Sequence, residues 1–163
     1  YMRYPMTWDK LSNSLHNYLD KNQRPGTISF NPVLTALNAH SILDLYHYEL
    51  TLAAKYRRQE LLWVLWIDLL WPEDKYINIK FLPQHIKKDL IQLYTEINAK
   101  LVLDFSCNID NIIAFLNQHL ELEITEQHRV NMLREITAFD KSRDQCYNDY
   151  LHPSIIEFLE NPL

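Results

Sequence analysis

Glycine is nearly absent from this sequence. Gly26 is the only glycine in 163 residues, whereas average usage of about 7% would give about eleven. A phosphate-binding loop, a dinucleotide-binding fingerprint and a nucleophile elbow each need several glycines, because the backbone must turn sharply or approach the ligand closely. The sequence therefore excludes these three kinds of site within the chain.

Cysteine is also scarce, and the charge is moderately acidic. Cys107 and Cys146 lie far apart and in no Cys-x2-Cys spacing, which excludes a disulfide framework or a zinc knuckle and favours a reducing, cytoplasmic compartment. The net charge of -5 gives no electrostatic support to nucleic-acid binding. The longest apolar run, residues 61–71, is short for a bilayer span and contains Asp68. We therefore expect no nucleic-acid partner and no membrane partner.

Residues 27–50 are the most informative stretch of the chain. Residues 27–34 are largely apolar and favour a strand, and from Ile42 onward the apolar residues recur at helical spacing, with Ser41 able to cap the helix through its hydroxyl. A strand followed by a helix is a βα unit, and ligands of α/β folds usually bind at the carboxyl ends of the strands. Asn38 and His40 lie there and are candidate ligand-binding residues. The alternative is that the Asn38 amide only satisfies backbone groups of the loop.

Two further segments have extended character. Residues 61–70, with the sequence LLWVLWIDLL, suit a strand that is buried on both faces, but a continuous apolar run can also be a helix. Trp63 in this run is a candidate for lining a ligand pocket, although clustered aromatic residues more often form a core. Residues 76–81 alternate between polar and apolar and predict a short extended piece.

The remaining segments predict helices. An apolar stripe begins at Trp8 and ends near Lys21, and three more stripes follow Pro83, the last of them beginning at residue 123 or 125. Strand and helix units followed by all-helical sequence predict an α/β class with a helical extension. We place the boundary between residues 1–83, the βα units, and residues 84–163, the extension. Residues 139–145, FDKSRDQ, predict an exposed helix end with local ion pairs.

No group of residues points clearly to catalysis or metal binding. His40, Asp44 and His47 fall on one face of the predicted helix, which a metal ion could use, but a solvated polar face explains the same spacing. We therefore predict no metal site and no catalytic residue within this chain. The other histidines are scattered singly and are interpreted as surface residues: His16, His85, His119, His128 and His152.

Three short islands, taken in order, resemble a known family. They are residues 1–5 (YMRYP) before Trp8, residues 33–38 (VLTALN) before a helix, and residues 140–145 (DKSRDQ) before Tyr150 and Pro153. The order and the residues of these islands resemble the later half of radical SAM proteins of the twitch or SPASM-like branch. Residues 70–72 (LWP) and 82–83 (LP) match the family motifs that lie between the second and third islands. The tail departs from the family pattern, with Asp144 in place of a glycine and residues 152–154 (HPS) in place of PEL.

The resemblance implies a fold, an activity and cofactors. In this family a partial (β/α) barrel carries a Cys-x3-Cys-x2-Cys loop that holds a four-iron–four-sulfur cluster, and the cluster cleaves S-adenosylmethionine reductively to a radical. Neither this loop nor the glycine-rich S-adenosylmethionine motif occurs in the chain. The resemblance thus implies a carboxyl-terminal portion, a partial barrel fragment of parallel strands that is inactive alone, with the cluster and S-adenosylmethionine bound in the full-length parent.

The resemblance also assigns residues and partners. Asn38 and Arg3 match positions on the cofactor side of the barrel, and His40 and Trp63 are expected on the substrate side, where a peptide or small molecule would bind. Asp140 and Arg143 match the tail motif, for which a structural docking role is expected. The implied partner is the amino-terminal half of the barrel, in the same chain or in another.

A different class of function explains the sequence as well. The chain could be a non-catalytic, mostly helical protein-interaction module, whose aromatic residues form the core and part of a partner surface. The two hypotheses predict different structures. The barrel requires residues 27–34 and 61–70 to be adjacent parallel strands with an unpaired outer edge, and the module requires residues 61–70 to be helical.

Overall fold

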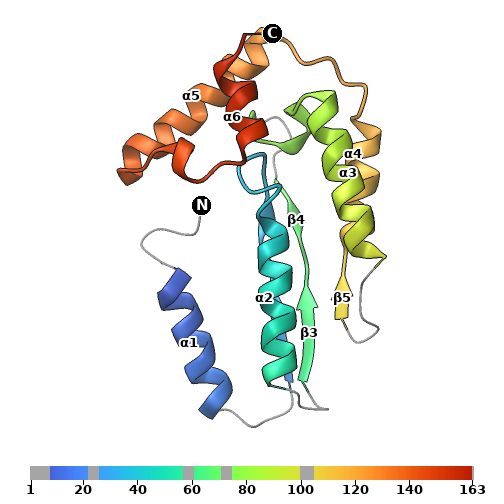
Figure 1. Ribbon diagram of the computed structural model, residues 1–163, viewed down its shortest axis with the longest axis vertical. Coiled ribbons are helices and arrows are strands. Elements are labelled where there is room, and N and C mark those ends of the chain that lie inside the picture. The colour runs from blue at the N-terminus through green and yellow to red at the C-terminus, as the bar shows by residue number, and fades with distance from the viewer. Residues whose placement is uncertain (1–7, 22–25, 57–60, 71–74, 100–104, 163) are drawn as a thin grey trace.

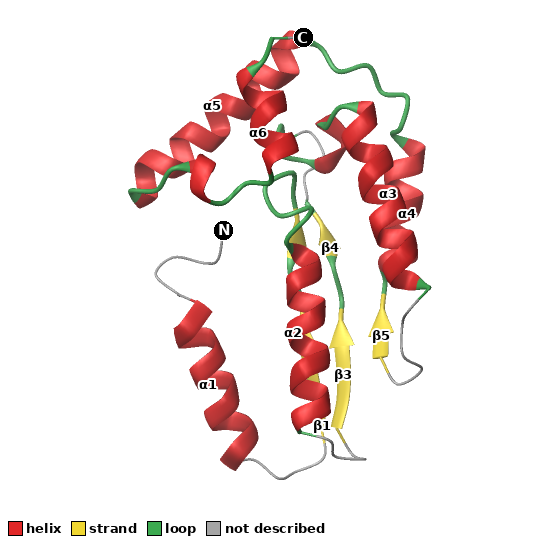
Figure 2. Cartoon of the chain, viewed as in Figure 1, coloured by secondary structure: helices red, strands yellow, loops and turns green. Residues whose placement is uncertain are grey.

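The chain forms a mixed α/β structure that is rich in helix (Figure 1, Figure 2). The computed structural model describes residues 8–21, 26–56, 61–70, 75–99 and 105–162. The strands are β1 (Gly26–Phe30), β2 (Val33–Leu34), β3 (Leu61–Leu65), β4 (Asp68–Leu69) and β5 (Phe105–Cys107). The helices are α1 (Trp8–Lys21), α2 (Ile42–Lys55), α3 (Gln84–Asn98), α4 (Ile109–Gln118), α5 (Glu126–Arg143) and α6 (Pro153–Glu160), with short 3-10 helices η1 (Ile79–Phe81) and η2 (Tyr147–Asp149).

Parallel pairing organises the strands. β1, β3 and β5 form one sheet in that order, and β2 pairs with β4 in a second, shorter sheet. The two sheets are joined, because the Trp66 amide donates to the Phe30 carbonyl and the Asp68 amide to the Pro32 carbonyl, both at 2.9 Å. Pro32 has no N–H to donate, so it interrupts the ladder without ending it. β1 with β2 and β3 with β4 thus behave as two long neighbouring strands.

The strand prediction was right for residues 27–34 and incomplete elsewhere. Residues 61–70, for which the sequence left strand and helix open, are β3 and β4. The sequence analysis missed β5, which follows residue 83, the predicted end of the βα units. At the end of β5 the Asn108 side chain accepts from the Ile67 amide at 2.7 Å and donates to the Ile67 carbonyl at 2.8 Å. A side chain therefore continues the pairing where the strand stops.

The two faces of the sheet differ in burial. Ile28 and Phe30 pack against the core, and Leu34 and Ile67 are almost fully buried. The residues of the opposite face are mostly exposed: Thr27, Ser29, Val33 at 46%, Trp66 at 47% and Asp68. Their alternation follows the two-residue period of strands. Among the described residues, helices therefore cover one face of the sheet and leave the other open.

Helices α1 and α2 lie beside each other on the covered side. α2 is antiparallel to the strands that it joins and lies beside β3 in Figure 1. The Tyr48 hydroxyl of α2 is 2.8 Å from the Ser12 hydroxyl of α1, and the Tyr56 hydroxyl is 2.8 Å from Nδ1 of His16. α2 covers the length predicted from its apolar spacing. The predicted hydroxyl cap was wrong, because the Ser41 hydroxyl donates to the Asn38 carbonyl instead.

Helices α3 and α4 pack together and enclose a buried lysine. Lys87 is fully buried, and its ammonium donates to the carbonyls of His119 at 2.5 Å and of Lys80 at 3.3 Å. Burial lowers the pKa of Lys87. The preceding residues 76–81 are not extended as predicted. Asn78 accepts from the Lys80 amide at 3.0 Å and starts η1, because its amide side chain favours local backbone bonds.

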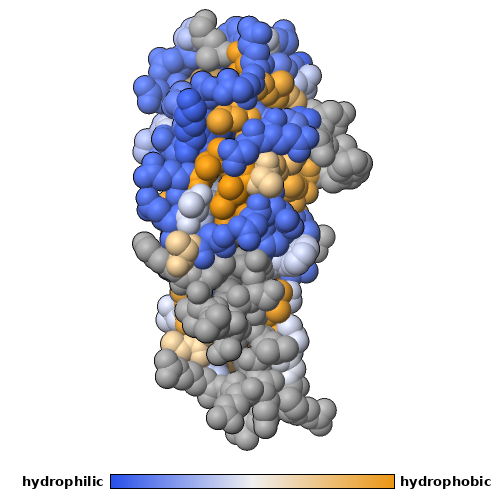
Figure 3. Space-filling view, turned by 90° about the vertical axis from the view of Figure 1, so that its right-hand side faces the viewer, coloured by the Kyte–Doolittle hydropathy of each residue, from blue (hydrophilic) through white to orange (hydrophobic). Residues whose placement is uncertain are grey.

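A tight turn follows α5, the first of the two carboxyl-terminal helices. The side chain of Thr125 caps α5, and the helix ends at Asp144, whose φ of 53° is left-handed. The carboxylate of Asp140 is buried and accepts from the Tyr147 amide at 2.7 Å, which fixes the chain as it leaves α5. Figure 3 shows hydrophobic surface among hydrophilic residues on the side of α3 and α4. No helix in the described ranges is both long and apolar enough to cross a bilayer.

A carboxyl group is buried in the middle of α2. Glu49 has no exposed surface, and neither of its carboxylate oxygens has a hydrogen-bond partner among the described residues. Burial raises the pKa of Glu49 to about 8, because the ionised form loses its hydration. The unfolded chain, with a pKa near 4.5, releases this proton more readily than the folded protein does. Stability therefore falls as the pH rises from 4.5 to about 8.

Replacing Glu49 by glutamine removes this titration. We expect Glu49→Gln to be more stable than the natural protein near the upper end of this pH range, with a difference that grows by at most about 1.4 kcal/mol per pH unit. Urea unfolding across the range measures it. Glu123→Gln, at an exposed carboxylate, is the matched control and should leave the pH profile unchanged. A wild-type slope in Glu49→Gln would contradict the assignment.

Candidate functional site

The carboxyl end of β2 continues into a tightly bonded loop. The Ala36 amide donates to the Ile77 carbonyl at 2.7 Å, and the Ile42 amide donates to the Asn38 carbonyl at 2.9 Å. The hydroxyl of Tyr94, a buried residue of α3, donates to the Ala39 carbonyl at 2.5 Å. The bond from Tyr94 attaches the loop to α3. Together the three bonds fix the position where α2 begins.

The Asn38 amide supports this loop. Its oxygen accepts from the Thr35 amide at 2.8 Å and from the Thr35 hydroxyl at 3.1 Å, and its nitrogen donates to the Val33 carbonyl at 2.9 Å. These contacts agree with the alternative that Asn38 satisfies backbone groups. A contact with a cofactor stays a prediction, as does the role of Arg3, which lies outside the described residues. Trp63 lies in β3 opposite Ile28, and its side chain is outside the described part of the chain.

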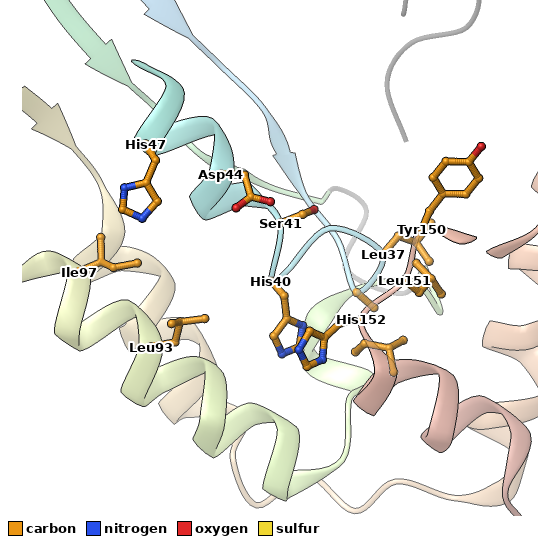
Figure 4. A pocket seen from close by; sticks show the side chains of 12 residues that line it. Leu37, His40, Ser41, Asp44, His47, Leu93, Ile97, Tyr150, Leu151 and His152 are labelled. Atoms are coloured by element: carbon orange, nitrogen blue, oxygen red, sulfur yellow. The ribbon is translucent and has the colours of Figure 1, made fainter. Parts of the chain in front are cut away.

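His40 lies in a pocket of about 490 Å³ between the β2–α2 loop, α2, α3 and the residues that lead into α6 (Figure 4). Pockets of this size accommodate small ligands. One side of the wall is apolar and comes mainly from α3 and α6, and the other side is polar and comes from α2 and the loop. The lining residues are Ala36, Leu37, His40, Ser41, Asp44, His47, Leu93, Ile97, Tyr150, Leu151, His152 and Ile155.

Two imidazoles stack at the side of this pocket. The rings of His40 and His152 are 3.7 Å apart between centroids and 9° from parallel, and Figure 4 shows them overlapping face to face. His152 precedes α6, where its Nδ1 accepts from the Ser154 amide at 3.4 Å and lies 2.8 Å from the Ser154 hydroxyl. The stack therefore joins the loop after β2 to the start of the last helix.

His40 is held in its neutral form. Burial and, to a smaller extent, the nearby His152 lower the pKa of His40 from 6.5 to about 4, while Asp89 of α3 acts in the opposite direction. Nδ1 of His40 is buried and has no hydrogen-bond partner among the described residues. A positive charge on the stacked His152 ring disfavours protonation of His40, since two positive charges at this distance repel.

The sequence analysis identified one half of this pair. His40 was a candidate because of its place after a strand, whereas His152 was interpreted as an isolated surface residue. A sequence signal for His152 existed, because a polar residue followed by proline and an apolar run is typical of a helix start. It shows where α6 begins, but it carries no information about the distance to His40, which is 112 positions away.

Asp44 and His47 lie on the same pocket but do not complete a metal site. Both are exposed on α2, and the described residues contain no group of three or more His, Cys, Asp or Glu side chains placed to hold a metal ion. The polar groups around the pocket are thus imidazoles, hydroxyls and one carboxylate. Such groups suit ligand binding through charge and hydrogen bonds.

The open face of the sheet is a second candidate surface. Trp66 and Asp68 point away from the covering helices at the carboxyl end of the strands, and Asp68 lies opposite Val33 in the neighbouring strand. Parallel sheets are nearly always covered on both faces. An exposed tryptophan and valine on such a face indicate a surface that another part of a protein could cover.

Comparison with known proteins adds no assignment, because no family model, no curated protein and no solved structure matches this chain.

Removing the Asn38 side chain tests its part in the loop. We expect Asn38→Ala to destabilise the protein by about 1–3 kcal/mol, since the Thr35 amide and the Val33 carbonyl lose their partner. Urea unfolding measures this loss. Asn31→Ala, at an exposed asparagine with one side-chain bond, should change stability much less. Equal effects of the two substitutions would show that Asn38 does not hold the loop.

The lowered pKa of His40 predicts a loss of stability in acid. The unfolded chain takes up this proton near pH 6.5 and the folded protein near pH 4, so stability falls as the pH drops through this interval. His40→Phe keeps an aromatic ring for stacking and removes the titrating group, and its acid slope should be shallower. The control is His85→Gln, at an exposed histidine of α3. The assignment fails if His40→Phe and the control have the same slope.

Proposed function

We propose that this chain is the carboxyl-terminal portion of a radical SAM oxidoreductase-like protein. In this proposal the strands are the late wall of a partial (β/α) barrel, and α5 and α6 belong to a helical extension behind it. The chain supplies barrel wall and substrate-side residues. The four-iron–four-sulfur cluster, which cleaves S-adenosylmethionine reductively, belongs to the amino-terminal part of the barrel.

The observation that carries the proposal is a parallel sheet that the described part of the chain covers on one face only. β1, β3 and β5 are neighbours in chain order, and α2 and α3 connect them. In (β/α) barrels parallel strands follow one another in this way and the helices lie outside, whereas doubly wound sheets carry helices on both faces. The exposed side chains of Val33 and Trp66 would then face the barrel interior.

The free edge of β1 supports the same proposal. β1 pairs only with β3 among the described strands, so its other edge is available to a further strand. An unpaired strand edge is a liability that proteins usually cover. A preceding barrel strand, from the same chain or from another, would pair there and would be the partner that the resemblance implies.

The tail fits the docking role that the resemblance implies for it. Asp140, the first residue of the tail island, accepts from the Tyr147 amide and turns the chain toward α6. α6 then places His152 against the loop after β2. The tail island thus helps to fix the position of the helical extension. This supports a structural function for Asp140. The substrate, a peptide or a small molecule, would bind on the open side, whereas His40, which was expected on the substrate side, lines a pocket on the helix-covered side.

The alternative was a non-catalytic, mostly helical interaction module. That hypothesis needed residues 61–70 to be helical, with apolar faces that close on one another. β3 and β4 occupy these residues instead and pair in parallel with β1 and β2. The observed pairing is the one that we expected for the barrel.

The test joins this chain to the protein segment encoded upstream of it in the same reading frame. We expect that segment to contain Cys-x3-Cys-x2-Cys. The joined protein, reconstituted with iron and sulfide without oxygen, should show iron–sulfur absorption and release 5′-deoxyadenosine from S-adenosylmethionine when reduced. This chain alone should do neither, and a joined protein with the three cysteines changed to alanine is the control. An upstream segment without the loop, or a joined protein without cleavage, overturns the proposal.

A further inference from the structure

The described lining of the pocket beside His40 carries formal charge of one sign only. Asp44 is the only formally charged residue in its described lining, which contains no lysine and no arginine. A second carboxylate, Asp89, lies close enough to act electrostatically on His40. The imidazole of His40 stays neutral because it is buried against His152. With one carboxylate and no lysine or arginine in the described lining, the pocket favours a cation over an anion.

The apolar wall of the pocket sets a second requirement for a ligand. Leu93 and Ile97 of α3 form one wall, across from Asp44 and His47 of α2 (Figure 4). Ile155 and Leu151 add apolar surface from the start of α6. A ligand that fills this space needs an apolar body against α3 and a positive group toward α2, because ligand pockets combine apolar walls with a few orienting polar groups.

We propose that this pocket binds a small organic cation, an ammonium attached to an apolar group. The carboxylate of Asp44 binds the ammonium, and Leu93 and Ile97 contact the apolar group. A metal ion fits less well, since the described residues hold no set of three metal-binding side chains. The pocket is built from this chain's own described residues, so the inference is independent of the proposed function.

The pocket also connects two parts of the fold. Its polar side belongs to the βα unit, and His152, Leu151 and Ile155 belong to the segment that leads into α6. A ligand bound between them stabilises the folded arrangement, because it binds the folded protein and not the unfolded chain. A melting temperature that rises with the ligand concentration is therefore expected together with binding.

The probe is phenethylamine, and phenylacetate is its anionic counterpart of similar size. Each compound is titrated into isotope-labelled protein, and the amide chemical shifts are recorded. Phenethylamine should give saturable shift changes at residues around the pocket, and phenylacetate should give none. Asp44→Asn should weaken phenethylamine binding by about three- to tenfold, as expected for a partly exposed charge pair. Glu123→Gln removes an exposed carboxylate outside the pocket lining and should leave the affinity unchanged.

A second variant tests the apolar wall. Leu93→Trp enlarges a half-buried side chain of the wall and should abolish binding by filling the cavity. The inference is overturned if phenethylamine gives no saturable shifts, if phenylacetate binds equally well, or if Asp44→Asn and Glu123→Gln bind alike. Asp44 is on the surface of α2, so its substitution leaves the core intact and keeps the test valid if Leu93→Trp fails to fold.

Discussion

The parallel pairing of two interrupted strands determines the rest of this structure. β1 and β2 face β3 and β4, and the bonds to the carbonyls of Phe30 and Pro32 keep the same pairing across the break. Because the side chains alternate along each strand, one register decides which residues face the helices. A shift of β1 and β2 by one residue against β3 and β4 would bring Val33 into the core and expose Leu34. The covered face, the open face and the position of the loop after β2 all follow from this register.

The same register explains why two candidate surfaces lie at one end of the molecule. The strands end where the loop of Asn38 and His40 begins, and α6 returns to this loop from the far end of the chain. The pocket forms on the helix-covered side, with imidazoles and one carboxylate around it. The open side carries Trp66 and Asp68. The first surface is complete within the chain, and the second is one that a larger barrel would enclose.

Much of the architecture is predictable from local patterns. The apolar stripes gave α1 to α5, because helical spacing over ten or more residues is a strong signal. The continuous run at residues 61–70 allowed either strand or helix, and only the tertiary pairing decides. β5 was missed because three residues, Phe105 to Cys107, are too short to show a period. Residues 76–81 alternate as a strand does, but the Asn78 side chain accepts from the Lys80 amide and starts η1.

The candidate site was less predictable than the fold. Its place after a strand suggested Asn38 and His40, but local sequence does not tell whether an amide bonds to its own loop or to a ligand. The contact between His40 and His152 depends on how the extension folds back, which no local pattern encodes. Buried Glu49 and Lys87 were likewise hidden, since charged residues at helical spacing usually face solvent.

Amide hydrogen exchange in β1 tests the central claim most directly. If the sheet of this chain is open, amides of Gly26–Phe30 that point away from β3 exchange rapidly in the isolated chain. In the proposed barrel, these amides become protected by pairing with a preceding strand. Strong protection of all β1 amides in the isolated chain would contradict the account, because the outer edge would then already be paired.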